Sequence, residues 1–122
     1  MEDIFIVEID NGGPSDGEWH VKLLTPEAQG RLKAKVYKHK RKLSEDEKAV
    51  AFLRQLMHTM IIGGKLKNGR EITREVIDRI FDVDLELLNE VVDEATEQQK
   101  QQLADELGNL SDGESGTSPQ TE

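Results

Sequence analysis

The longest periodic run of apolar positions lies in residues 44–62, SEDEKAVAFLRQLMHTMII. Its apolar side chains recur at steps of three and four residues, which is the spacing of one face of an α-helix. Ser44 and Glu47 have the spacing of a capping box at a helix start, and Gly63 with Gly64 is typical of a helix end. We therefore predict a core helix over residues 44–62. Its apolar face consists of Ala49, Phe52, Leu53, Leu56, Met57, Met60 and Ile61.

Two short segments before this helix have the pattern of β-strands. Residues 4–9 are rich in β-branched and aromatic side chains, and residues 19–23 alternate between apolar and polar positions. Residues 11–17 between them have the composition of a loop, so the sequence predicts an antiparallel hairpin. A lone hairpin is barely stable in water, and it must pack on helices or pair with another chain. Its unpaired edge is a candidate docking site.

Helix-start signals appear at three further places. Thr25 is followed by Pro26, which suits the first helical position, and this helix should run to about residue 40. Thr73 precedes a third helical pattern, and either Asp82 or Asp84 can cap a fourth. The apolar positions of these helices are Ala28, Leu32, Val36 and Tyr37, then Val76, Ile77, Ile80 and Phe81, and finally Leu85, Leu88, Val91, Val92 and Ala95.

These patterns predict an α+β protein that is mostly α, with an N-terminal β-hairpin followed by a four-helix assembly. We expect one small domain over residues 1–107, with the hairpin in 1–24 and the helices in 25–107. Asn68-Gly69 is a strong hairpin signal, so residues 65–72 should form either a small β-ribbon or an exposed loop. Residues 108–122 are mostly Gly, Ser, Asp, Thr and Glu. Such a segment cannot bury enough apolar surface to order itself, and a disordered acidic tail is expected.

Charge is distributed unevenly along the chain, whose net charge is −9. Residues 22–42 hold eight basic side chains against one acidic, whereas residues 63–122 hold fifteen acidic against six basic. Such a dipolar chain favours head-to-tail contacts or a charged partner at low salt. Lys35, Lys38 and Arg41, within the basic segment 31–42, are candidate partner-binding residues. The pI near 4.8 and the single aromatic of that segment, Tyr37, argue against nucleic acid and favour an acidic protein partner.

Candidate catalytic and metal-binding chemistry is sparse. The chain has no cysteine, and its three histidines, His20, His39 and His58, lack the spacing of metal ligands. Asp82 and Asp84 lack the glycine and terminal glutamate of a calcium loop. No P-loop, dinucleotide fingerprint or nucleophile elbow is present. We therefore expect no enzymatic activity, no cofactor and no metal.

The longest uninterrupted apolar run, residues 60–62, is far too short to cross a bilayer. The N-terminal segment is acidic and lacks the basic region and long apolar core of a signal peptide. The sequence therefore predicts a soluble, cytoplasmic protein that does not insert into membranes.

The layout of the chain resembles the small tail assembly chaperones of long-tailed bacteriophages. The resemblance rests on the segment WHVKLLTPEAQGRLKAKVYK, on the block NGREITREVIDRIFDVDLELLNEVVDEA, and on the acidic stretch DVDLELL before a Gly- and Ser-rich tail. It covers roughly residues 18–110. The resemblance implies a non-enzymatic chaperone that binds and solubilises the tape-measure protein during tail morphogenesis, in the host cytoplasm, and that helps recruit tail-tube subunits.

Exposed Leu or Met side chains would suit an amphipathic partner helix. The aromatic side chains are few, so we expect Leu53, Met57 and Met60 to be only partly buried and to meet a partner or a second copy. Two other functions stay open. One is a small regulatory or nucleic-acid-binding protein that uses residues 31–42, and the other is a structural head–tail joining protein.

Overall fold

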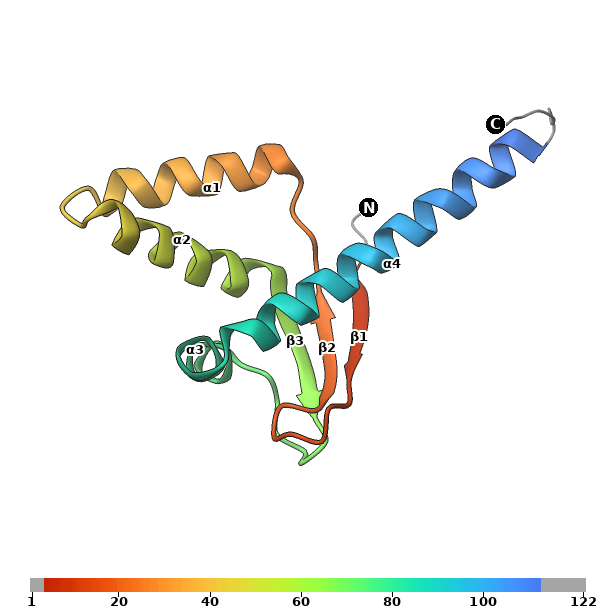
Figure 1. The fold of residues 1–122 in the computed structure, drawn as a ribbon, viewed down its shortest axis with the longest axis horizontal. Coiled ribbons are helices and arrows are strands. Elements are labelled where there is room, and N and C mark those ends of the chain that lie inside the picture. Colours follow the sequence, from red (N-terminus) through yellow and green to blue (C-terminus); the bar gives the residue numbers. More distant parts are fainter. Residues whose placement is uncertain (1–3, 113–122) are drawn as a thin grey trace.

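The computed structural model describes residues 4–112, with the side chains described up to residue 108. It shows a mostly helical α+β fold with an N-terminal β-hairpin and four helices, as predicted (Figure 1). One strand was not predicted. In chain order the elements are β1 (Phe5–Ile9), β2 (Gly17–Val21), α1 (Pro26–His39), α2 (Glu45–Met60), β3 (Ile61–Leu66), α3 (Arg74–Val83) and α4 (Leu85–Asp112).

The three strands form one antiparallel sheet in the order β1-β2-β3. Trp19 sits in the middle strand, opposite Val7 on one side and Gly64 on the other. Alternate residues of β1 and β2 are buried, which places one face of the sheet against the helices. The indole Nε1 of Trp19 donates a hydrogen bond to the carbonyl oxygen of Ser15 at 3.1 Å, so this fully buried ring has its polar atom satisfied.

The third strand corrects the predicted end of the core helix. Helix α2 ends at Met60, and the chain passes directly into β3 without a left-handed helix end at Gly63. Ile61 pairs with Val21 and is buried, which suits a β-branched residue in a sheet. Gly64 does have a positive φ of 130°, but it lies inside the strand. Residues 25–107 are therefore not purely helical.

Both outer strands make hydrogen bonds beyond the sheet. The Ile72 N–H donates to the Gly64 carbonyl oxygen at 3.0 Å, and Lys65 forms a β-bridge with Glu71. These contacts form the small ribbon that the Asn68-Gly69 turn indicated. On the other side, the Gln98 side-chain amide of α4 donates to the Ile6 carbonyl oxygen of β1 at 2.9 Å. The predicted docking edge is therefore partly occupied by the chain's own residues.

The predicted helix starts are confirmed by their capping contacts. Ser44 and Glu47 form a complete capping box, with hydrogen bonds of 2.9 and 3.2 Å. The Thr25 and Thr73 hydroxyls accept from the third backbone N–H after each. Of the two aspartates proposed for the fourth helix, Asp84 is the cap, because its carboxylate accepts from the Leu87 N–H at 3.3 Å.

Helix α4 is longer than the sequence predicted. The tail was expected to begin at residue 108, but the helix continues to Asp112. Residues 97–107 consist mostly of Gln, Glu, Lys, Ala and Leu, which are good helix formers even without a packing partner. The rest of the predicted tail, residues 113–122, lies outside the described residues. None of the described helices is long and apolar enough to cross a membrane.

The loop before β2 is organised by Asp16. Its carboxylate accepts from the backbone N–H groups of Asn11 and Gly12, each at 2.8 Å. The hydrogen bond from Asn11 is the main cause that lowers the pKa of Asp16, since it stabilises the ionised form. The Lys67 N–H donates to the Asp16 carbonyl oxygen at 2.9 Å. Asp16 thereby joins this loop to the ribbon after β3.

The two neighbouring glycines of β3 provide a matched test of the sheet. A Cβ on Gly64 would lie 2.2 Å from the Glu18 carbonyl oxygen, at a φ that L side chains rarely adopt, whereas a Cβ on Gly63 would meet nothing within 4 Å. We predict that Gly64→Ala lowers the free energy of unfolding by about 3 kcal/mol. Gly63→Ala should change it by less than about 0.5 kcal/mol. Urea unfolding of both variants measures the difference, and equal losses would contradict this account of β3.

Candidate partner-binding groove

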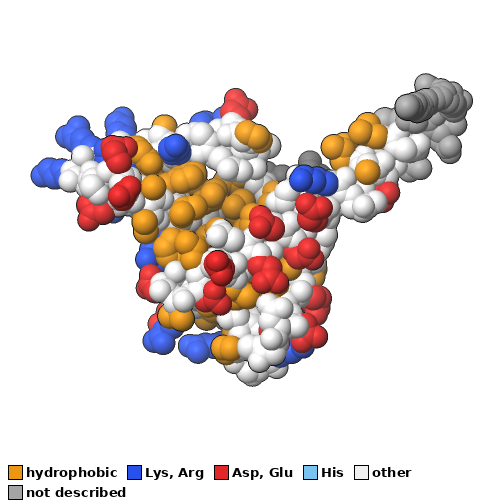
Figure 2. Space-filling model, in the orientation of Figure 1, with side chains coloured by type: hydrophobic (Ala, Val, Ile, Leu, Met, Phe, Trp, Pro, Cys, Tyr) orange, Lys and Arg blue, Asp and Glu red, His pale blue; other side chains and the backbone are white. Residues whose placement is uncertain are grey.

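An apolar groove lies where the α1–α2 hairpin and helix α4 diverge from the sheet. Hydrophobic atoms gather in this angle in the space-filling view, between the basic end of the hairpin and the acidic α4 (Figure 2). The groove encloses about 360 Å³. Its floor comes from α2, one wall from the linker between β2 and α1, and the other wall from α4. The apolar lining residues are Leu23, Leu24, Pro26, Leu53, Leu56, Met57, Met60 and Val92.

The polar residues of the groove are Gln29, Asn89, Thr96 and Gln99. None of the described residues that line it carries a charge. Gln29 and Thr96 already bond to backbone carbonyl oxygens of their own segments. The groove therefore offers apolar surface with an uncharged polar border. It suits an apolar stripe on a partner better than an ionic group.

Three of the predicted partner-binding residues come together in this groove. Leu53 is half-buried, as expected, and Met57 and Met60 line the groove beside it. Met57 and Met60 are only 2% and 3% exposed, so the expectation that they would be partly buried is wrong. The reason is that both side chains also belong to the hydrophobic core that joins α2 to the sheet and α4. Their role in partner binding stays a prediction.

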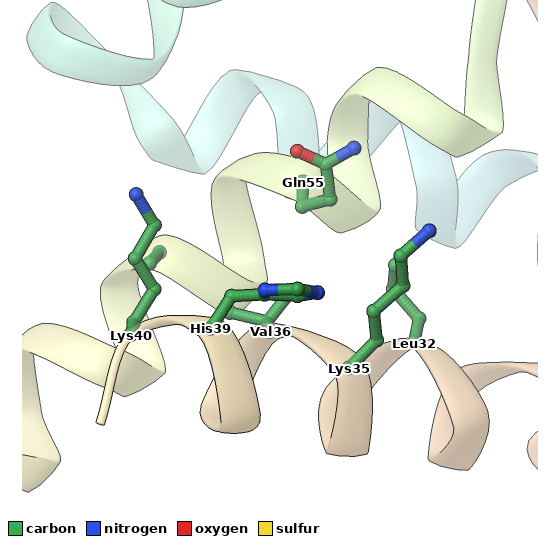
Figure 3. Close-up of a pocket in the computed structure, with 7 residues that line it drawn as sticks. Leu32, Lys35, Val36, His39, Lys40 and Gln55 are labelled. Carbon is green, nitrogen blue, oxygen red and sulfur yellow. The ribbon is translucent and has the colours of Figure 1, made fainter.

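The other three predicted residues, Lys35, Lys38 and Arg41, lie outside the groove. Lys35 borders a second hollow of about 260 Å³ between α1 and α2, where it projects beside the apolar Leu32 and Val36 (Figure 3). Lys38 and Arg41 are exposed near the turn of the hairpin. The structure thus separates an apolar candidate surface from a basic one.

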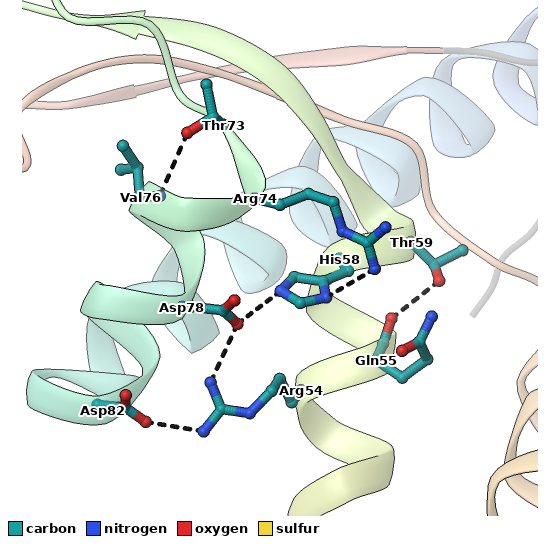
Figure 4. A network of polar contacts seen from close by, with 9 residues as sticks. All are labelled: Arg54, Gln55, His58, Thr59, Thr73, Arg74, Val76, Asp78 and Asp82. Atoms are coloured by element: carbon teal, nitrogen blue, oxygen red, sulfur yellow. Dashed lines mark hydrogen bonds and ion pairs between the residues drawn. The ribbon is translucent and has the colours of Figure 1, made fainter.

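A polar network on the other side of α2 holds it to α3 (Figure 4). Arg54 donates to Asp78 at 3.0 Å and to Asp82 at 2.7 Å, and its guanidinium lies 4.4 Å from the centre of the Phe81 ring. His58 Nε2 lies 2.7 Å from the same Asp78 oxygen. Hydrogen bonds to Asp82 and Asp78 raise the pKa of Arg54. The network therefore fixes the angle between two helices and leaves the groove on the neighbouring face of α2, about 100° around the helix.

The proton position on His58 follows from its two partners. Arg74 Nη2 lies 3.1 Å from His58 Nδ1, and an arginine can only donate. Nδ1 must then be the acceptor, and Nε2 carries the hydrogen that is donated to Asp78. Both ring nitrogens are occupied in this way, so His58 acts as part of the contact between α2 and α3.

A third hollow, of about 760 Å³, lies between β1 and α4 and is acidic. Asp10 on its border accepts from Lys67 at 2.8 Å, and Asn11 donates to Glu90 at 3.4 Å. Among the described residues, no group of three or more His, Asp and Glu side chains is placed to hold a metal ion. Most of the carboxylates that line this hollow come from α4, so we interpret it as part of the acidic surface of that helix.

Comparisons with protein-family models, with curated proteins and with solved structures found no match for this chain. Its function is therefore inferred from its own surfaces. Of these surfaces, sequence periodicity had indicated the α2 part of the groove. The α4 wall, with Asn89, Val92, Thr96 and Gln99, was not anticipated, because Val92 was predicted only as one of the apolar positions of the fourth helix and the three polar residues carry no pattern of their own.

The network of Asp78 predicts a pH-dependent contribution to stability. Burial alone raises the pKa of Asp78, but hydrogen bonds from Arg54 and His58 outweigh it, and the pKa ends below its ordinary value. A carboxyl whose pKa is lower in the folded state stabilises the fold above its unfolded pKa, about 3.9. This stabilisation is lost as the pH falls through the lower, folded value.

We therefore predict that Asp78→Asn lowers the free energy of unfolding by about 1 kcal/mol at pH 7, a modest value because the Asp78 side chain is 41% exposed. The difference from the native chain should shrink as the pH falls below the unfolded pKa and through the lower, folded pKa of Asp78. Urea unfolding from pH 2.5 to 7 measures this. The exposed Asp93→Asn is the control, and a destabilisation by Asp78→Asn that does not depend on pH would contradict the prediction.

Proposed function

We propose that this protein is a non-enzymatic binding protein that holds an amphipathic helix of a partner protein in the groove between α2 and α4. The observation that carries the proposal is the groove itself, with an apolar floor and an uncharged polar border. Binding of an amphipathic helix in an apolar groove is a recurrent mode of recognition, in which the partner inserts side chains from one face. No reaction needs to be assumed.

The side chains of the floor support a binder that tolerates different helices. Met57 and Met60 lie almost fully buried beneath the floor, and their unbranched side chains can shift to accommodate partner side chains of different shape. Leu53 is half-buried and borders the same space. A partner stripe of Leu, Ile, Val or Met would bury itself against these residues, whereas a charged stripe would lose its hydration without gaining an ion pair.

The partner that we propose is the tape-measure protein of a long-tailed bacteriophage. The resemblance in sequence layout to phage tail assembly chaperones points to it, and a long helical protein with apolar stripes is the kind of partner that the groove suits. The net charge of −9 would help to keep such a complex in solution, because like-charged complexes repel one another. In this proposal the chaperone acts in the host cytoplasm and is released as the tail assembles.

Co-expression with a helical fragment of the tape-measure protein from the same genome tests the function. We expect the native chain to keep the fragment in the supernatant and to copurify with it. Leu53→Glu places a charge in the floor, and Gln99→Lys places one on the exposed border of the groove. Leu53→Glu should weaken binding roughly tenfold or more, because the apolar contact would then bury an unpaired charge. Gln99→Lys should weaken it less, because a lysine at the exposed border can keep its charge in water.

Val83→Glu is the matched control, since Val83 is 87% exposed and does not line the groove. Circular dichroism of each variant separates lost binding from lost folding. If Gln99→Lys and Leu53→Glu fold and still bind the fragment like the control, the groove is not the binding site. A fragment that neither dissolves nor copurifies with the native chain would remove the tape-measure protein as the partner.

Two simple observations discriminate the other candidate functions. A shift in the electrophoretic mobility of DNA or RNA that weakens with salt would favour a nucleic-acid-binding regulator. Reversing the charges of Lys35, Lys38 and Arg41 should then abolish the shift. Recovery of the chain from purified virions would favour a head–tail joining protein, because a chaperone leaves before assembly is complete.

A further inference from the structure

Strand β1 is an open edge of the sheet, because in the order β1-β2-β3 it has a neighbouring strand on one side only. The carbonyl oxygen of Gly64 in β3 accepts from the Ile72 N–H, so it points away from β2. The pair Trp19–Gly64 is then not hydrogen-bonded, and the backbone polar groups of Trp19 point to β1. Trp19 lies opposite Val7, which therefore bonds to β2. The register of the sheet thus determines which groups of β1 face the open side.

The backbone groups that face the open side belong to Ile6 and Glu8, since these groups alternate along an antiparallel strand. Gln98 agrees with this assignment, because its amide donates to the Ile6 carbonyl oxygen from outside the sheet. That oxygen can accept a second hydrogen bond, and Gln98 itself is exposed. Among the described residues, no backbone group bonds to the N–H groups of Ile6 and Glu8. Such an unpaired row is a template for another strand.

One flank of α4 follows this edge. Gln98 bonds to Ile6 near the start of β1. Glu90 accepts from the Asn11 side chain, just after the end of β1, at 3.4 Å. Glu94 is four residues from both Glu90 and Gln98, so the three side chains share one side of the helix. The Glu94 carboxylate is therefore carried toward the middle of β1, between the two contacts.

The hollow along this flank is strongly acidic. Seven of the nine residues that line it are Asp or Glu, and none of the nine is basic. Asp10 is bonded to Lys67, and Glu97 lies 3.6 Å from Lys100, but Glu94 has no cationic partner among the described residues. Figure 2 shows acidic side chains along α4 and down the side of the molecule on which β1 lies in Figure 1. The open edge of β1 therefore lies in a negative field.

This field excludes two occupants of the edge. A second copy that paired through its own β1 would bring two acidic hollows together. Residues 113–122 of the chain contain two Glu and no basic residue. Like charges would oppose either contact. A strand with Lys or Arg side chains on the side that faces α4 would instead place cations beside carboxylates.

We propose that β1 binds an extended, basic segment of another protein as a fourth strand of the sheet. The backbone of this segment would bond to Ile6 and Glu8, and its Lys or Arg side chains would face Glu90 and Glu94. Its alternate side chains would be apolar, because they would lie beside Ile6, which is 46% exposed on the outer face of the sheet. In this mode of recognition main-chain hydrogen bonds give affinity and alternate side chains give specificity. The site is separate from the groove between α2 and α4.

Titration of the full chain with a short peptide of alternating Lys and Val residues tests the site. At low salt we expect a Kd of about 0.1 mM or tighter, measured by isothermal titration calorimetry. The same peptide with Glu in place of Lys should not bind. A peptide of the same composition with all its Lys residues before its Val residues should bind roughly tenfold more weakly, because as a strand it cannot present charged and apolar side chains on opposite faces.

Amide hydrogen exchange locates the bound strand without any substitution. The N–H groups of Ile6 and Glu8 face away from β2 and should be protected roughly tenfold or more when the peptide is in excess. Those of Val7 and Ile9 already bond to β2 and should change little. Protection of Ile6 and Glu8 that grows with the concentration of the chain alone would assign the edge to a second copy and overturn the proposal.

Two pairs of variants separate the contribution of charge from that of the backbone. Glu94→Lys should weaken peptide binding roughly tenfold. Glu106→Lys is the same change on the same helix outside the hollow, and it should alter binding by less than about twofold. Ile6→Pro removes an N–H that faces the open side, and it should bind the peptide roughly tenfold more weakly than Ile6→Ala, which keeps that N–H. Circular dichroism verifies that each variant is folded.

A native chain that does not bind the alternating peptide would overturn the proposal. So would binding that protects neither Ile6 nor Glu8, or that Glu106→Lys weakens as much as Glu94→Lys, since either result would indicate attraction by net charge alone. Leu53→Glu, in the floor of the groove, should bind the peptide like the native chain. Capture of the tape-measure fragment is a separate readout, so either proposal can fail without the other.

Discussion

The arrangement of this fold depends on the close approach of β2 and β3 at Trp19. The indole is fully buried, and the backbone of Gly64 lies opposite it with no room for a Cβ. This pairing draws β3 against the hairpin, and β3 follows α2 without an intervening loop. The direction in which α2 leaves the sheet is therefore tied to the sheet register. Since α1 packs on α2, the junction between Met60 and Ile61 also sets the direction in which the whole α1–α2 hairpin extends from the sheet.

The polar network between α2 and α3 completes this positioning. Arg54 and His58 lie on the α3 side of α2, whereas Leu53, Met57 and Met60 turn toward the groove. Helix α4 follows α3 after the single residue Asp84, which caps it, so the ion pairs that hold α3 also limit where α4 begins. Two contact surfaces of α2 thus set the width of the groove between α2 and α4. The apolar surface packs on the sheet and α4, and the polar surface is bonded to α3.

Local chemistry explains which elements could be predicted from the sequence. Thr25, Ser44 and Thr73 cap helices through contacts that span only three residues, and such short-range signals do not depend on the rest of the fold. The boundary at Met60 depends instead on a third strand that pairs with residues 40 to 49 positions earlier. Ile61 continues the apolar stripe of α2 equally well as helix or as strand, and only its pairing with Val21 decides between them. Periodicity cannot detect that choice.

The same distinction applies to the candidate surfaces. The α2 side of the groove follows from a helical repeat, but its α4 wall arises from tertiary packing, which a single sequence does not reveal. The basic segment was visible as composition, yet its apolar hollow needed the packing of α1 against α2. Sequence could show that charge was separated along the chain, and the fold adds that the turn of the α1–α2 hairpin, which follows the basic residues, lies away from the acidic hollow between β1 and α4 (Figure 1).

This separation has a consequence for how the two surfaces would respond to salt. The groove has no charged lining among its described residues, so binding there would rest on apolar burial, which ordinary salt concentrations change little. Binding of an acidic partner to the basic segment 31–42 would rest on exposed charges, which salt screens within about a Debye length. Ionic strength would therefore act on binding at residues 31–42 while leaving the capture of a helix in the groove largely intact. A single chain of this size can in this way keep two binding surfaces energetically independent.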